Sequence, residues 1–195
     1  MWAVASLALA ACSLRADGPP APAFELTNQL GETVSLEGLQ GRVVVLTFLY
    51  THCPDVCPLY LSKIGQAMFL AGEDAARGVA VVAATVDPER DTVEQLRDYM
   101  AQFPPGWQFL TGTPGQLKTM WEDYGIFVSQ GEAAPGEDSH HDHAGYEVTH
   151  TAKVVLIDRE GRLRSELMGD WDVAELAEKV RRLAVGEPLP RPGLL

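Results

Sequence analysis

The segment VVVLTFLYTHCPDVCP, residues 43–58, carries the clearest structural signal in the chain. Its first seven residues are nearly all β-branched, aliphatic or aromatic, which is typical of a central strand buried on both faces. Two cysteines follow the strand directly, and Pro58 suits the first turn of a helix, where a missing N–H costs nothing. The segment therefore predicts a strand, a cysteine-bearing loop and a helix in succession.

The rest of the pattern predicts one α/β domain. A second buried strand is expected at residues 79–85, and hairpins are expected at residues 24–36 and 152–168. Helices are expected from Pro58 to about Gly72, from a capping box at residues 91–94, from a second one at residues 113–116, and along the stripe Val173, Leu176, Val180 and Leu183. This order predicts a mixed sheet sandwiched by helices, with a long exposed loop from Gln130 to Gly145.

The N-terminus predicts export and lipid anchoring. Residues 2–11 are apolar and uncharged, but they fall short of the roughly 20 residues that cross a bilayer, and so resemble the apolar core of a secretory signal. The run ends in Leu-Ala-Ala-Cys12, which resembles the lipobox of bacterial lipoproteins. We therefore expect a lipoprotein-type signal at 1–12, a Pro-rich tether at 13–23, the domain at 24–186 and a loose tail at 187–195. The alternative is a frayed apolar N-terminus, since no Lys or Arg precedes the run.

Charge and cysteine content narrow the function. The net charge of −12 argues against a nucleic-acid partner, which needs clustered Lys and Arg for phosphate contacts. If Cys12 carries lipid, Cys53 and Cys57 are the only thiols left among the three cysteines. Outside the cytoplasm such a pair tends to oxidise, so it has to be re-reduced or held by a metal.

The residues alone leave three chemistries open for the thiol pair: disulfide exchange, metal binding, and an inert disulfide that staples the loop. The start of a helix favours anions, so we expect a stabilised thiolate at Cys57. Tyr50 and His52 lie close in sequence. A structural zinc site wants four ligands, whereas Cu(I) accepts two thiolates and one imidazole.

His150 is the candidate for that imidazole, because it stands just before the predicted strand at residues 152–157. In thioredoxin-like folds the loop before the corresponding strand usually places a cis-proline followed by Thr against the thiols. Here the apparent counterpart is His150-Thr151, and an imidazole can complete a Cys₂His site. The alternative is an ordinary surface histidine.

Taken together, these motifs resemble the Sco/SenC family, thioredoxin-fold copper chaperones that help assemble the binuclear copper centre of cytochrome c oxidase. The resemblance covers residues 24–183, and the combination of motifs is more specific than any one of them. The matching stretches are TFLYTHCPDVCP at 47–58, TVDPERDT at 85–92, LTGT at 110–113, HT at 150–151 and VVLID at 154–158.

The resemblance implies a thioredoxin-like fold with an added N-terminal hairpin, and copper ligands at Cys53, Cys57 and His150. Both Cu(I) and Cu(II) are held at this site in the family. Asp55 and Asp87 fall in family motifs, where they would tune the thiols or meet a partner. For Asp87, Glu89 and Asp91, helix capping and solvation is the competing interpretation.

A cluster of histidines in the long loop raises a second metal hypothesis. His140, His141 and His143 would capture Cu(II) or pass copper inward, because imidazole and carboxylate suit divalent copper. The competing interpretation is a solvated loop that binds metals only adventitiously.

Three functions follow from these expectations. The first is a metallochaperone that delivers copper to cytochrome c oxidase subunit II, receives it from another copper donor protein, and is lipid-anchored on the outer face of the cytoplasmic membrane. The second is a thiol-disulfide reductase that keeps the copper-site cysteines of the oxidase reduced. The third is a copper or redox sensor with no transfer step. His150 discriminates between the first two, because disulfide exchange has no need of an imidazole.

Overall fold

The computed structural model describes residues 18–53, 56–131 and 146–190. Cys12, Asp55, His140, His141 and His143 lie outside these ranges, so the predictions made for them are not tested here. In the described part of the chain, no helix is both long and apolar enough to cross a bilayer.

A mixed sheet of seven strands forms the centre of the domain, in the order β2-β1-β5-β4-β3-β8-β9. Strands β3, β4 and β5 are parallel to one another, and the remaining pairs are antiparallel. The strands are β1 (Glu25–Asn28), β2 (Thr33–Ser35), β3 (Val43–Leu49), β4 (Val79–Thr85), β5 (Gln108–Thr111), β8 (Lys153–Ile157) and β9 (Leu163–Met168).

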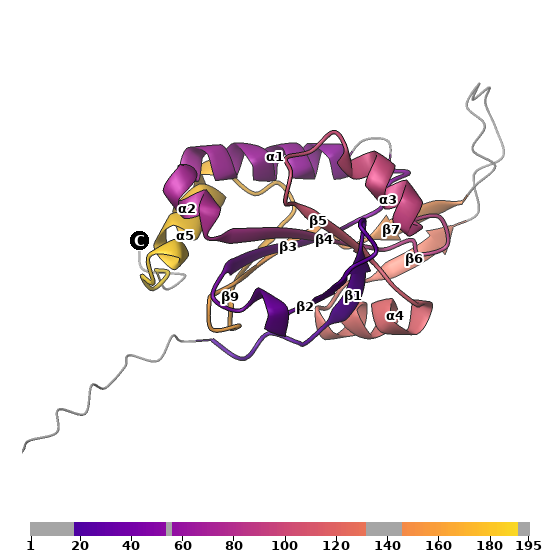
Figure 1. The fold of residues 1–195 in the computed structure, drawn as a ribbon, viewed down its shortest axis with the longest axis horizontal. Helices are drawn as coiled ribbons and strands as arrows, with labels where there is room; N and C mark the ends of the chain where they lie inside the picture. The colour runs from indigo at the N-terminus through magenta and orange to yellow at the C-terminus, as the bar shows by residue number, and fades with distance from the viewer. Residues whose placement is uncertain (1–17, 54–55, 132–145, 191–195) are drawn as a thin grey trace, which may run out of the picture.

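Helices cover both faces of this sheet. Helices α1 and α5 lie against each other on one face, and α4 lies on the other (Figure 1). The helices are α1 (Val56–Ala71), α2 (Glu73–Arg77), α3 (Val93–Met100), α4 (Pro114–Asp123) and α5 (Val173–Ala184), with a short 3₁₀ turn η1 (Glu37–Leu39). Every residue of β3 and β4 is buried, as expected for strands with both faces covered.

Two further strands stand apart from the main sheet. Strands β6 (Val128–Gly131) and β7 (Glu147–His150) pair with each other in an antiparallel hairpin, in which Val128 lies opposite His150. The prediction that residues 130–145 are all loop is therefore wrong at its start, because Gln130 pairs with Val148. The long segment between the two strands hides their pairing from a local pattern.

The predicted strands, the two hairpins and the four predicted helices are all present. Helix α1 begins at Val56, two residues before the predicted Pro58, and the short elements η1, α2, β6 and β7 were not predicted. The strand β5 was not predicted. The predicted start of α3 is also one residue early, because Thr92 is the N-cap and its hydroxyl accepts a hydrogen bond from the Gln95 N–H. The Asp91 side chain does not cap α3, and it becomes part of the surroundings of the candidate site.

Candidate functional site

The two cysteines lie at the junction between β3 and α1. Cys53 follows β3 in a turn, and Cys57 is the second residue of α1. The Cys57 N–H donates to Cys53 Sγ at 3.4 Å, and both residues are in the dithiol form. Cys53 is partly exposed, whereas Cys57 is buried. The pair therefore offers one accessible thiol and one protected thiol.

The fold brings His150 to this pair from 93 residues away. His150 ends β7, and its Nε2 atom lies 4.0 Å from Cys57 Sγ. Its Nδ1 atom lies 3.1 Å from the Thr151 carbonyl oxygen. A carbonyl can only accept, so Nδ1 carries the proton and Nε2 turns its lone pair toward the thiol. Such a backbone anchor is the usual way of orienting a metal-binding histidine.

Tyr50 completes the wall of the site. Its ring meets the His150 imidazole edge to face, with centroids 5.9 Å apart and planes at 83°. Burial raises the pKa of the Tyr50 phenol to about 12, so it stays neutral. Burial also lowers the pKa of His150, which keeps the imidazole neutral at physiological pH.

The expectation of a low-pKa thiol at Cys57 is wrong in this structure. The pKa of Cys57 is raised, first by its hydrogen bond to Cys53 and then by burial. Cys57 does stand at the start of a helix, as predicted, but the neighbouring sulfur and the loss of water outweigh the helix terminus. Cys57 is thus a protonated thiol until something displaces the proton.

Within the described residues, no three or more His, Cys, Asp or Glu side chains are arranged to hold a metal ion. The spacing of the pair Cys57 and His150 is nonetheless close to that of two ligands on one ion. Metal–sulfur and metal–nitrogen bonds of about 2.3 and 2.0 Å, as for zinc, at 120° place the ligand atoms about 3.7 Å apart. The observed 4.0 Å requires only a small inward movement.

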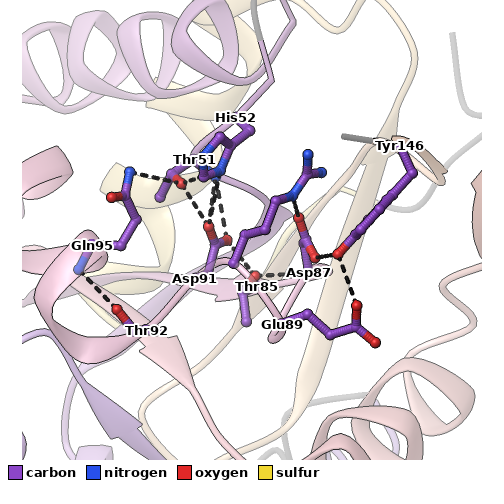
Figure 2. A network of polar contacts seen from close by, with 10 residues as sticks. Thr51, His52, Thr85, Asp87, Glu89, Asp91, Thr92, Gln95 and Tyr146 are labelled. Carbon is purple, nitrogen blue, oxygen red and sulfur yellow. Dashed lines mark hydrogen bonds and ion pairs between the residues drawn. The ribbon is translucent and has the colours of Figure 1, made fainter. Parts of the chain in front are cut away.

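His52 takes a different direction. Its Nδ1 atom lies 3.0 Å from the Thr51 hydroxyl and 3.9 Å from Asp91 Oδ1. Figure 2 shows Thr51 and His52 gathered around Asp91, together with Thr85. His52 therefore belongs to a polar network beside the site.

Asp91 is the centre of that network, and its burial contradicts the solvated capping role. Its side chain is fully buried and accepts from the Thr51 N–H at 3.2 Å and the Thr51 hydroxyl at 2.6 Å, and also from the Thr85 hydroxyl. Burial raises the pKa of this carboxyl. Asp91 thus holds the backbone of the loop that leads to Cys53.

Asp87 is also fully buried, and its carboxylate has one partner from the same loop and one from a distant segment. Tyr146 donates its hydroxyl to Asp87 Oδ1 at 2.6 Å, and Arg90 forms an ion pair with Asp87 Oδ2. Glu89 is exposed, and its carboxylate accepts from the same tyrosine hydroxyl at 3.2 Å. Helix capping and solvation therefore does not describe Asp87. Tyr146 has no signal in the sequence, because neither periodicity nor a motif singles it out.

Comparison with known proteins places this geometry in context. The family model SCO1/SenC matches residues 15–185. Protein SCO1 homolog 1 of Arabidopsis thaliana, a mitochondrial protein, is 35% identical over 157 residues, which cover 80% of this chain and 45% of that protein. A SCO2-like protein of Rickettsia prowazekii is 32% identical over 155 residues, covering 80% and 72% of the two chains.

Among solved structures, ScoI of Bradyrhizobium japonicum with copper bound is similar along nearly its whole length. The TM-score is 0.71 at 32% identity, covering 85% of this chain and 99% of that one. The likeness confirms the predicted thioredoxin-like α/β fold. The mitochondrial relative is longer, since this chain matches less than half of it.

Proposed function

Because the chain belongs to the SCO1/SenC family, we propose that it is a copper chaperone that holds the metal through Cys53, Cys57 and His150. One observation carries the proposal: His150 Nε2 lies 4.0 Å from Cys57 Sγ while Nδ1 is tied to the Thr151 carbonyl. An imidazole so fixed is neutral and presents its lone pair to the thiols, as a metal ligand must.

The ligand chemistry supports copper. Thiolates are soft ligands that select Cu(I), while imidazole also suits Cu(II), so the trio can serve both oxidation states. The similar ScoI structure contains copper. Each bound thiol loses its proton to water when the metal arrives.

The exposure of the thiols supports a route for transfer. Cys53 is partly exposed and Cys57 is buried, so an incoming ligand reaches Cys53 first. Copper then passes by ligand exchange, one bond at a time, with Cys57 the last to let go. We propose the binuclear copper centre of cytochrome c oxidase subunit II as the acceptor and another copper protein as the donor.

The anchor and the compartment are parts of the same proposal. A lipid on Cys12 and a tether at residues 13–23 would hold the domain on the outer face of the cytoplasmic membrane. The variant Cys12→Ser is expected to move the protein from the membrane fraction to the soluble fraction. The idea fails if both forms sediment equally with membranes. Copper capture by His140, His141 and His143 stays a prediction.

The central test is copper titration of the reduced domain in competition with a chelator. His150→Ala should weaken copper binding by about 10-fold or more, because one of three ligands is lost. His52→Ala is the matched control, since His52 is a neighbouring imidazole that turns toward Thr51, and it should bind like the wild type. Equal affinity of the wild type and His150→Ala would contradict the chaperone proposal.

A thiol-disulfide reductase is the second candidate, favoured by the pairing of a partly exposed Cys53 with a buried Cys57. Cys53 would attack a partner disulfide, and Cys57 would displace the partner thiol, leaving a Cys53–Cys57 disulfide and passing two electrons and two protons to the partner. In this case His150→Ala keeps reducing an oxidised peptide from the oxidase copper site. Failure of the wild-type dithiol to reduce that peptide would exclude the reductase.

A further inference from the structure

The hairpin of β6 and β7 carries His150, so the contacts that hold this hairpin determine where the imidazole lies. Within the described residues, strands β6 and β7 pair with each other and not with the strands of the main sheet. The C-terminal end of β7 is tethered to the main sheet, because β8 begins three residues after His150 and its Val154 pairs with Thr47 of β3. The other end of β7, before His150, contacts the loop that follows β4.

Tyr146 immediately precedes β7 and fastens it to the loop after β4. Its hydroxyl donates to Asp87 at 2.6 Å and to Glu89 at 3.2 Å, and the Arg90 guanidinium stacks over its ring at 4.1 Å from the centroid. Arg90 in turn forms an ion pair with Asp87. Figure 2 shows Tyr146 reaching across to Asp87 and Glu89 from the opposite side of the network.

Asp87, which accepts the hydrogen bond from Tyr146, is itself held firmly in place. Asp87 is fully buried, and its N–H donates to the Thr85 hydroxyl at 2.9 Å. The Asp87 carbonyl accepts from the N–H groups of Arg90 at 3.3 Å and Asp91 at 2.9 Å. The backbone of Asp87 is thus held at three points and its carboxylate is held by Arg90, so the carboxylate can serve as a fixed reference for Tyr146.

Arg90 provides a second route to the imidazole. Its guanidinium lies 5.9 Å from the centroid of the Tyr50 ring, and that ring meets His150 edge to face. The same loop also holds the segment that carries the thiols, because Asp91 binds Thr51 two residues before Cys53. The loop that leads to Cys53 and the strand that carries His150 are thus both attached to residues 85–91.

We propose that Tyr146, Asp87 and Arg90 form a positioning clamp that sets the approach of His150 to Cys57. The contacts of the clamp do not depend on the proposed copper function. Only their consequence rests on it: the clamp holds the third ligand, the His150 imidazole, in place before the metal arrives. Without the clamp, β7 keeps its pairing with β6 and its connection to β8, but its first residues lose a fixed contact, and the distance from His150 to Cys57 can vary.

The test compares two variants that each delete one hydrogen-bonded tyrosine hydroxyl. Tyr146→Phe removes the hydrogen bonds to Asp87 and Glu89 and keeps the ring beneath Arg90. Tyr124→Phe is the matched control, because its hydroxyl donates to the Pro22 carbonyl at 2.7 Å, in a different segment. We expect Tyr146→Phe to weaken copper binding by about 10-fold, the low end of the range for losing a hydrogen-bond partner of a metal ligand, because Tyr146 acts on His150 through the backbone of β7, and to change the Cu(II) EPR spectrum. Tyr124→Phe should change neither.

A second readout uses no copper. In the reduced, metal-free protein, the ring ¹H–¹⁵N signals of His150 report the Nδ1–H bond to Thr151 and the surroundings of Nε2. We expect these signals to shift or broaden in Tyr146→Phe and to stay in place in Tyr124→Phe. If the wild type binds no copper, the chaperone proposal fails, but these signals still test the clamp. Unchanged ring signals in Tyr146→Phe would overturn the clamp, as would wild-type copper affinity with an unchanged EPR spectrum in that variant.

Discussion

The imidazole of His150 is set up by a backbone oxygen. The Thr151 carbonyl accepts from Nδ1, and this choice of partner decides which nitrogen faces Cys57. A carboxylate in the same place would have raised the pKa of the ring and favoured imidazolium, which cannot bind a metal. Burial lowers the pKa of His150 by more than the hydrogen bond to the neutral carbonyl raises it, so the ring stays neutral.

The protonation of the two ligands predicts the pH dependence of copper binding. The raised pKa of Cys57 means that its thiol is protonated at neutral pH, so copper must displace that proton. Apparent affinity should therefore rise with pH between 6 and 8, by about 10-fold per pH unit for each proton released. His150 should add less pH dependence than an ordinary histidine, because burial lowers its pKa.

Chelator competition at pH 6, 7 and 8 measures this directly, with the chelator's own protonation taken into account. An affinity that does not change over this range would show that both thiols are already ionised. That outcome would contradict the protonated Cys57 described above.

Among the elements, helix α3 shows how one residue of offset builds part of the site. Thr92 caps the helix, so Asp91 is released from that role and turns inward to Thr51 and Thr85. The carbonyl of Asp87 accepts from the Asp91 N–H, which closes the turn before the cap. The loop at residues 85–92 is therefore shaped jointly by a helix start and two buried carboxylates.

The cap itself can be tested for stability. Thr92→Ala removes the acceptor of the Gln95 N–H and should lower the free energy of unfolding by about 1 kcal/mol, as measured by urea denaturation. Thr119→Ala is the control, because Thr119 lies inside α4 and its hydroxyl bonds only to the Gly115 carbonyl one turn earlier. That substitution should be nearly neutral. Equal losses in both variants would mean that the Thr92 hydroxyl has no capping role.

For the whole molecule, the packing of α5 on α1 supports the helix that carries Cys57. Leu176 is fully buried in α5, and α1 and α5 lie side by side on one face of the sheet (Figure 1). Both helices cover the same core, so their contact contributes to stability. It does not set the positions of the ligand atoms of Cys57 and His150.

Leu176→Ala should therefore reduce global stability by about 2–5 kcal/mol, because it leaves a cavity in a close-packed core. Copper affinity of the folded variant should stay near that of the wild type. Leu70→Ala is the matched control, since Leu70 in α1 is 53% exposed and should cost little. Thermal unfolding and copper titration of the two variants separate these effects, and a loss of copper affinity in folded Leu176→Ala would contradict the separation.

Much of the fold was predictable because its signals are local. The buried runs at residues 43–49 and 79–85 coincide with β3 and β4, and the capping box at Thr113 starts α4 as expected. Strand β5 was not found, because it has four residues, and its partners β1 and β4 lie far away in sequence. A short strand of this kind is defined by its neighbours in space more than by its own pattern.

The chemistry of the site divides in the same way. The spacing and placement of Cys53 and Cys57 are properties of a single turn between a strand and a helix, so they could be inferred directly from the residues. The burial of Asp87 and Asp91 could not, because a buried carboxylate is stable only with donors that come from other segments. The place of His150 before the strand at residues 152–157 did indicate an imidazole near the thiols, but its 4.0 Å approach to Cys57 across 93 residues is set by the fold. The contact of Tyr146 with Asp87 left no local pattern to detect, and only the folded chain brings these two residues together.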